Sequence, residues 1–235
     1  MSFDTSRFSF HPWNDYFGVV MQQGRVQLDA DWNEWVAELG RRLHAGTMDT
    51  VGRAVVPRTT PEGFHILAAG GVLSIGVGRM YVDGLLAENH GKPPLAWDAG
   101  LAELSGSAPT PFLDQPYLPF NEINQPAPAN IFNRPALSGG PHLVYIDVWQ
   151  RELTHLQAPD LVEKAVGVDT TGRLQTVWQV KLLHNIGDAG CFTPDAELPA
   201  WAALIRPSGA RLSNSIGTVT GGPNPCLAPP SAGYK

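Results

Sequence analysis

The stretch FHILAAGGVLSIGVGRMYVDGLLAEN, residues 64–89, decides the fold class of this 235-residue chain. Its short apolar runs are bounded by glycines, which is typical of strands separated by turns. The predicted strands are residues 64–67, 72–77, 79–82 and 85–89. Asp83-Gly84 separates the last two strands and is a favoured pair for a tight hairpin turn. We therefore expect a β-rich α+β fold with a mixed or antiparallel sheet core.

Upstream of these strands, the sequence predicts one long helix from Leu28 to His44. Acidic residues occupy its opening turns, basic residues its last turn, and Gly46 is placed to end it. At 100° per residue its apolar side chains fall within an arc of about 100°. We call this set the Leu/Trp stripe: Leu28, Trp32, Trp35, Val36, Leu39 and Leu43. We expect the stripe to pack into the core of the chain.

The opposite face of the predicted helix carries small and polar residues. They follow spacings of 3, 4, 3 and 4, as at the seam of a coiled coil. These residues are Ala30, Asn33, Ala37, Gly40 and His44. One hypothesis is that copies of the helix pack around a symmetry axis through this face. The alternative is that the face is simply exposed to solvent.

Downstream of the strands, residues 92–141 carry ten of the 21 prolines. That density is incompatible with a helix or a sheet interior, so we expect an extended arm whose aromatic side chains dock on this chain or on a neighbour. The predicted intersubunit anchors are Tyr117, Phe120 and Phe132. Two long strands are expected afterwards, at 142–149 and 174–184, with a short helix at 158–166.

By composition the chain divides into three parts. Residues 1–60 form an N-terminal extended segment plus helix, which we interpret as an assembly unit. Residues 61–205 form a β-rich domain that the arm at 92–141 interrupts, and residues 206–235 form a Gly/Pro-rich tail. Only 16% of the residues are charged. A chain with so few charges is expected to have part of its surface covered by partners.

Several classes of function are excluded by the same composition. The net charge of −6 and the lack of a basic stripe argue against binding nucleic acid. Neither a signal peptide nor a membrane-spanning segment is expected. We predict no metal and no cofactor, because Cys191 and Cys226 lack a CxxC partner and Asp29 to Glu34 match only the start of an EF-hand loop. The two cysteines are either free thiols or one disulfide.

No catalytic residues are predicted, since the sequence contains no nucleophile elbow, zinc-protease or phosphate-loop motif. We therefore expect that the protein is not an enzyme.

One string, however, resembles a known family. It runs from Phe8-Ser-Phe10 through Tyr16 and MQQGRVQLDADWNE at residues 21–34. Further matching segments are Tyr81 to Asn89, Asp114 to Pro116, Leu143 to Trp149 and Val177 to Lys181. Together they resemble the N-terminal domain family, of unassigned function, found in gene clusters of phage-tail-like contractile injection systems and prophage tails.

The resemblance implies a structural component of a contractile phage-tail-like particle. The protein would act as a baseplate-associated or fibre-attachment adaptor that contacts other tail or baseplate proteins. It would be a homo-oligomer, with a trimer as one candidate, made in the bacterial cytoplasm and assembled into the particle. The alternative is a glycan-binding or glycan-cleaving tail-spike module that uses Trp13, Trp97 or Trp201 as stacking platforms.

Overall fold

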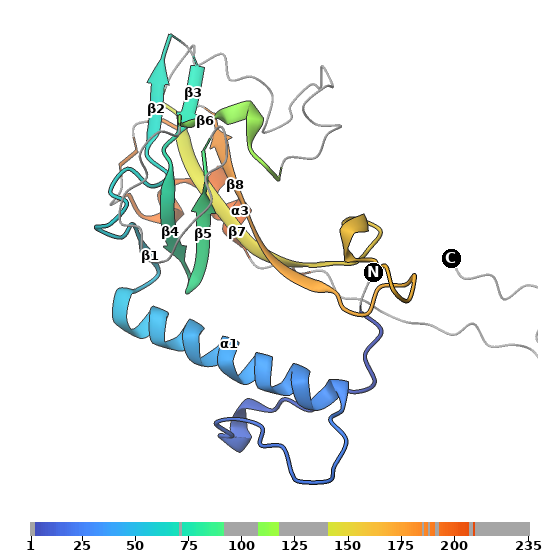
Figure 1. Cartoon of the computed structure of the whole chain (residues 1–235). Helices are drawn as coiled ribbons and strands as arrows, with labels where there is room; N and C mark the ends of the chain where they lie inside the picture. Colours follow the sequence, from blue (N-terminus) through green and yellow to red (C-terminus); the bar gives the residue numbers. More distant parts are fainter. Residues whose placement is uncertain are drawn as a thin grey trace, which may run out of the picture. The chain divides into compact units, whose positions relative to one another are not determined.

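The computed structural model describes residues 3–70, 72–91, 108–117, 141–184, 186, 187, 189, 190, 193–206 and 209. Over these residues it confirms a β-rich α+β fold in which antiparallel strands dominate over two α-helices (Figure 1). The chain forms two compact units, residues 1–190 and residues 191–235. Within the described ranges, no helix is long and apolar enough to cross a membrane.

The long helix α1 spans Asp29–Val51 and so continues past the predicted end at Gly46. At its start, the Asp31 carboxylate accepts a hydrogen bond from the Leu28 amide at 3.2 Å, which satisfies one free N–H of the first turn. Helix continuation past Gly46 is possible because an isolated glycine costs only about 1 kcal/mol in a helix. Gly52, with φ of 83°, ends the helix instead.

Two small antiparallel sheets follow α1 along the chain. The first has the strand order β1 (Ala54–Val55), β4 (Gly78–Val82) and β5 (Leu85–Asn89). The second has the order β2 (Ile66–Ala69), β3 (Val72–Ile75) and β6 (Thr110–Pro111). The predicted turn between β4 and β5 is present, with φ of 44° at Asp83 and 78° at Gly84, the positive values that such a hairpin requires.

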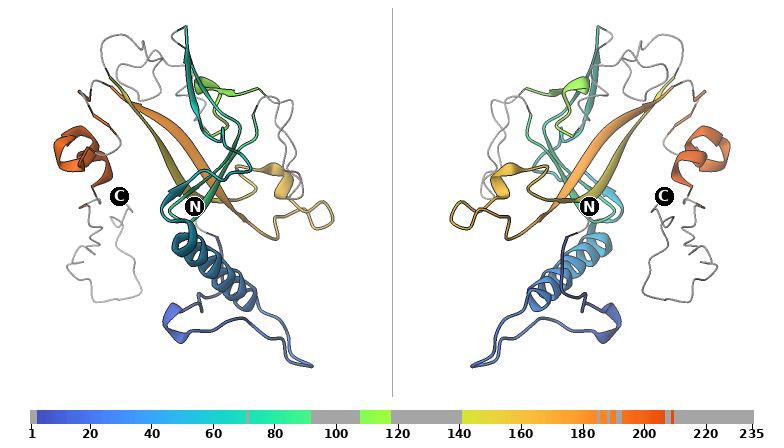
Figure 2. Two further views of the ribbon diagram at one scale, coloured as in Figure 1. Left: turned by 90° about the vertical axis from the view of Figure 1, so that its left-hand side faces the viewer. Right: turned by 90° about the vertical axis from the view of Figure 1, so that its right-hand side faces the viewer.

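The longest strands are β7 (Leu143–Leu153) and β8 (Arg173–Leu183), which pair along their whole length in one twisted hairpin (Figures 1 and 2). Both were expected, although β7 extends four residues further than predicted. The helix expected at 158–166 is wrong. Only a 3₁₀ turn, η3 (Pro159–Leu161), forms there, because Gly167 with φ of 73° and the Val162–Asp169 bridge turn the chain back.

The core lies where β3, β5 and β8 meet. Trp178 is its largest buried side chain and contacts Phe64 and Tyr117 edge-to-face, with ring centroids 5.0 and 6.0 Å apart. Its indole N–H donates to the Glu88 carbonyl at 2.8 Å, so the ring is buried without an unsatisfied donor. Removing a buried aromatic ring of this kind costs about 3–5 kcal/mol, which makes Trp178 the main link between the hairpin and the small sheets.

One part of the proline-rich arm belongs to this core. Residues 110–117 include strand β6, a 3₁₀ turn (η2, Phe112–Asp114) and the buried side chains of Thr110, Phe112 and Gln115. No sheet interior was expected in the arm, and β6 is an edge strand. Pro111 is tolerated because β6 has only two residues and lies at the edge of its sheet.

The second unit is described at residues 193–206 and 209. It contains a 3₁₀ turn, η4 (Asp195–Glu197), and a short helix, α3 (Pro199–Ile205). The Trp201 indole donates to the Asp195 carboxylate at 2.9 Å, which links the turn to the helix.

Candidate interaction surface

The N-terminal segment, residues 3–28, covers one face of α1. Ser6 donates two hydrogen bonds to the Asp29 carboxylate, at 3.0 Å from its amide and 2.8 Å from its hydroxyl. These bonds, the amide one first, lower the pKa of Asp29. Ser9 reaches the Ala30 carbonyl, and Arg7 lies 3.9 Å from Asp31. The segment is thus tied to the first turn of the helix.

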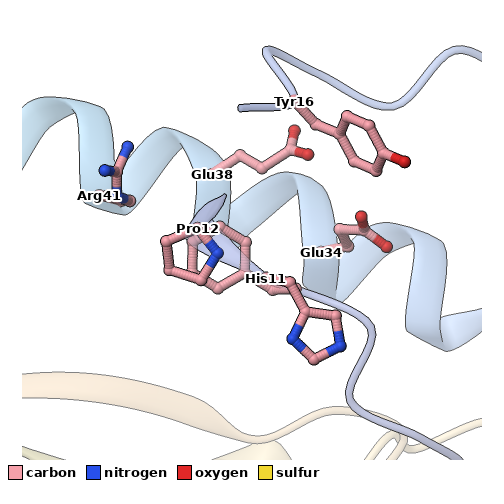
Figure 3. A pocket seen from close by; sticks show the side chains of 7 residues that line it. His11, Pro12, Tyr16, Glu34, Glu38 and Arg41 are labelled. Atoms are coloured by element: carbon pink, nitrogen blue, oxygen red, sulfur yellow. The ribbon is translucent and has the colours of Figure 1, made fainter. Parts of the chain in front are cut away.

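Further along, the same segment encloses a small cavity against α1. Figure 3 shows His11, Pro12 and Tyr16 from the segment opposite Glu34, Glu38 and Arg41 from the helix. The cavity has a volume of about 20 Å³, the space of one water molecule. Glu38 is buried beside it, and its Oε2 atom has no hydrogen-bond partner within the described ranges. A single water would satisfy this oxygen, so the cavity indicates packing rather than a ligand site.

The five residues predicted to form a seam on α1 are placed differently from one another. Ala30 is only 1% exposed and lies beneath the N-terminal segment. Ala37 is half-buried, whereas Asn33, Gly40 and His44 are exposed. His44 lies directly against Gly84 in the β4–β5 turn, where an added Cβ would come within 2.8 Å of its ring. The face is therefore partly occupied by the chain itself, and its role as a seam stays a prediction.

The Leu/Trp stripe is exposed, so the expectation that it packs into the core of this chain is wrong. Trp32 is 54% exposed, Trp35 41% and Leu43 63%, and the other three members are exposed to a similar extent. Of the 23 residues of α1, only Ala30 and Glu38 are buried. An amphipathic helix normally buries its apolar stripe and exposes its charges. Here the apolar stripe is exposed together with most of the polar residues of α1.

Apolar exposure continues from the stripe into the N-terminal segment. Arg42, beside the stripe, lies with its guanidinium 5.0 Å from the centre of the Phe17 ring. Phe17 is itself exposed, and the segment has other exposed large side chains: Phe8, Trp13, Tyr16, Val20, Met21 and Val26. Exposed apolar surface of this extent, rimmed by charged residues, marks an interaction site in soluble proteins.

Of the predicted arm anchors, only Tyr117 lies within the described residues. Its ring packs on Trp178 in the same chain, and its carbonyl accepts a hydrogen bond from Gln179 at 3.0 Å. Burial is also the main cause of its raised pKa. Phe120 and Phe132 lie outside the described residues.

The aromatic residues considered for glycan stacking are also only partly described. Trp13 is 76% exposed and stacks on His11, with centroids 4.8 Å apart and planes 22° from parallel. Trp201 is half-buried and bonded to Asp195, and Trp97 lies outside the described residues. In the described part of the chain, no three His, Cys, Asp or Glu side chains are grouped to hold a metal ion.

Sequence reasoning identified the stripe but assigned it to the core. The signal in the sequence that pointed to exposure was the low charge content. A chain with two tryptophans on one helix and few charges overall is expected to leave some apolar side chains exposed. Periodicity alone shows that a helix has an apolar face. It does not show whether the same chain covers that face.

The comparisons with known proteins give one match. The profile of a family of unknown function, DUF6519, covers residues 1–192, and the chain belongs to this family. No curated protein and no solved structure is significantly similar to the chain.

Proposed function

We propose that this DUF6519 protein is a structural component of a contractile phage-tail-like particle, where it acts as a baseplate-associated or fibre-attachment adaptor through protein–protein contacts. Two observations support the proposal. The sequence resembles the N-terminal domains encoded in such gene clusters, and the Leu/Trp stripe leaves an apolar helix face uncovered. The stripe carries most of the argument, because a surface of this kind is costly to expose and gains free energy when a partner covers it.

In this proposal the β-rich part is the rigid platform and α1 with the N-terminal segment is the contact element. The Trp178 cluster fixes the platform, while the α1 stripe contributes two tryptophans, the residue type most enriched among energetically dominant interface contacts. Partners would be other tail or baseplate proteins.

The test is co-sedimentation with particles that contain sheath and tube proteins. Leu39→Glu places a charge in the middle of the stripe without touching the core, so we expect a folded protein that no longer joins the particle. Val72→Glu is the matched control, since Val72 is also an exposed aliphatic side chain but lies on β3. The control should be incorporated normally. Wild-type protein that never sediments with particles would refute the proposal.

The second candidate function is a glycan-binding tail-spike module, and the observation that favours it is the exposed Trp13 ring. A flat aromatic face open to solvent can stack on a sugar ring. Under this alternative, a glycan array gives a specific signal that Trp13→Ala abolishes, whereas Leu39→Glu leaves it unchanged. The adaptor proposal predicts no such signal.

A further inference from the structure

We infer that the partner covering the Leu/Trp stripe is a second copy of the same chain, whose α1 packs antiparallel to the first around a two-fold axis near Trp35 and Val36. The inference deepens the proposed function and rests on it for the role of the stripe as a contact surface. It adds the identity of the partner and the direction in which the two helices run.

The Leu/Trp stripe is complementary to an antiparallel copy of itself. When two copies of α1 run antiparallel with their stripe centres aligned, Leu28 of one copy is level with Leu43 of the other. In the same register Trp32 is level with Leu39, and Trp35 is level with Val36. Every stripe residue is thus level with another stripe residue. Trp32 faces Leu39 near the middle of the stripe, whereas Trp35 and Val36 lie on opposite flanks, so each of these two lies beside its own counterpart in the other copy. An isologous two-fold contact requires this self-complementarity.

The charges along α1 also favour an antiparallel pair. On the N-terminal side of the stripe centre α1 carries Asp29, Asp31 and Glu34. On the C-terminal side it carries Arg41 and Arg42, together with the buried Glu38 and with Asp49 in the last turn. An antiparallel pair therefore places the acidic start of one helix beside the half of the other that carries both arginines. A parallel pair places like charges at the same level, which is unfavourable.

One ion pair follows from this geometry. Asp31 and Arg42 are eleven positions apart, so they lie within about 20° of each other on the same flank of the stripe. In an antiparallel two-fold pair the same flanks of the two helices face each other. Each Arg42 then lies within about half a turn of Asp31 of the other copy. Arg42 is exposed, and the Asp31 side chain is 31% exposed. Asp31 also accepts from the Leu28 amide and lies 3.9 Å from Arg7 of its own chain.

The exposed area of the stripe sets the expected strength of the dimer. Taking about 150–250 Å² for each full aromatic side chain and less for each aliphatic one, the exposed parts of the stripe amount to roughly 500 Å² per copy. A stable interface buries about 800 Å² per partner. Phe17, which is exposed next to Arg42, extends the surface toward that size. We therefore expect a dimer that dissociates on dilution rather than an obligate one.

Cysteine cross-linking of the full chain tests the direction of the helices. Cys191 and Cys226 are first replaced by serine. In the antiparallel pair, Val36 lies about 1.5 Å along the axis from its own counterpart, whereas the two Leu43 residues are about 22 Å apart. Because a disulfide needs Cα atoms about 4.4–6.8 Å apart, Val36→Cys should yield a covalent dimer under mild oxidation and Leu43→Cys should not.

Charge reversal tests the ion pair in the same purified protein. Sedimentation across a concentration series should show a doubling of mass for the wild type. Arg42→Glu, which places two acidic groups at each end of the interface, should shift the monomer–dimer midpoint to higher concentration. The reciprocal variant Asp31→Arg/Arg42→Glu should restore it. Circular dichroism of each variant checks that α1 is intact.

The outcomes separate this inference from the proposed function. Equal cross-linking by Val36→Cys and Leu43→Cys indicates parallel helices and overturns it, as does a wild-type mass that stays monomeric at all concentrations. In the monomeric case the stripe is covered by another part of the chain or by a particle protein. The adaptor proposal is then tested separately, by co-sedimentation with particles.

Discussion

The Gln115 side chain forms hydrogen bonds with both backbone groups of Val180 in β8, as the backbone of a neighbouring strand would. The variant Gln115→Glu tests how much these bonds stabilise the fold. The Gln115 amide nitrogen donates to the Phe112 carbonyl at 2.8 Å and to the Val180 carbonyl at 2.9 Å. Its oxygen accepts from the Val180 amide at 2.6 Å. Gln115 is buried, and these bonds hold residues 110–117 against the core.

The size of the effect follows from these contacts. Gln115→Glu keeps the shape and the accepting oxygen but removes both donated bonds, leaving two buried carbonyls opposite a carboxylate oxygen. Each buried acceptor without a donor costs about 1–3 kcal/mol, so we expect a loss of about 4 kcal/mol at neutral pH. For a chain of this size that corresponds to a decrease in Tm of about 10 °C.

The pH dependence gives a second, independent readout. Burial and the two carbonyls should raise the pKa of the new carboxyl above its unfolded value of about 4.3. The folded state then binds the proton more tightly than the unfolded state. The destabilisation is therefore complete above the raised folded pKa and becomes smaller as pH falls toward the unfolded pKa. Once protonated, the new carboxyl can also donate a hydrogen bond to one of the two carbonyls.

The assay is thermal unfolding followed by circular dichroism at pH 7.5 and pH 5. Gln175→Glu is the matched control, because Gln175 is a glutamine on β8 whose oxygen accepts from Arg151 at 2.9 Å on the exposed side of the hairpin. The control should change stability by less than about 0.5 kcal/mol. If Gln115→Glu unfolds at the same temperature as the control at pH 7.5, the assigned role of Gln115 is wrong.

Two further predictions concern other parts of the fold. Gly76→Ala should destabilise the protein by several kcal/mol, on the order of a severe core substitution, because the added Cβ would lie 2.0 Å from the Glu62 carbonyl oxygen. The matched variant Gly40→Ala in α1 meets nothing within 4 Å and should stabilise the helix by about 1 kcal/mol. Equal Tm values for the two variants would contradict this contrast. The hydrogen bond from His155 lowers the pKa of Asp169 below 3.8, so the carboxyl contributes stability above its unfolded pKa that is lost as pH falls through the folded one. In His155→Phe an NMR titration should show the Asp169 midpoint moving back up toward 3.8, and an unchanged midpoint would exclude the bond as its cause.

The strands and the helix could be predicted because their signals are local. Alternation of apolar residues, the Asp83-Gly84 pair and the helical period of the Leu/Trp stripe each depend on neighbours within a few positions. The predicted strands were confirmed to within a few residues at their ends. The errors were also local in origin: Gly46 does not end α1, and the segment after Pro159 forms a single 3₁₀ turn.

The candidate surface could be predicted only in part. The sequence predicted the long helix as part of an assembly unit, with small residues on one face and the Leu/Trp stripe on the other. Which face is covered depends on the N-terminal segment, whose hydrogen bonds from Ser6 and Ser9 reach more than twenty positions along the chain. No periodic pattern reports contacts over that separation.

Local sequence signals account for the fold class, the long helix and the main strands, and the composition shows a high apolar content with few charges. The burial of Phe112 and Gln115 of the arm, and the exposure of the Leu/Trp stripe, depend instead on the tertiary structure. The physical reason is that secondary structure follows from local spacing, whereas burial depends on which distant segments fill the space beside a side chain. In this chain the core is filled by Trp178 and its neighbours, so the tryptophans of α1 remain exposed.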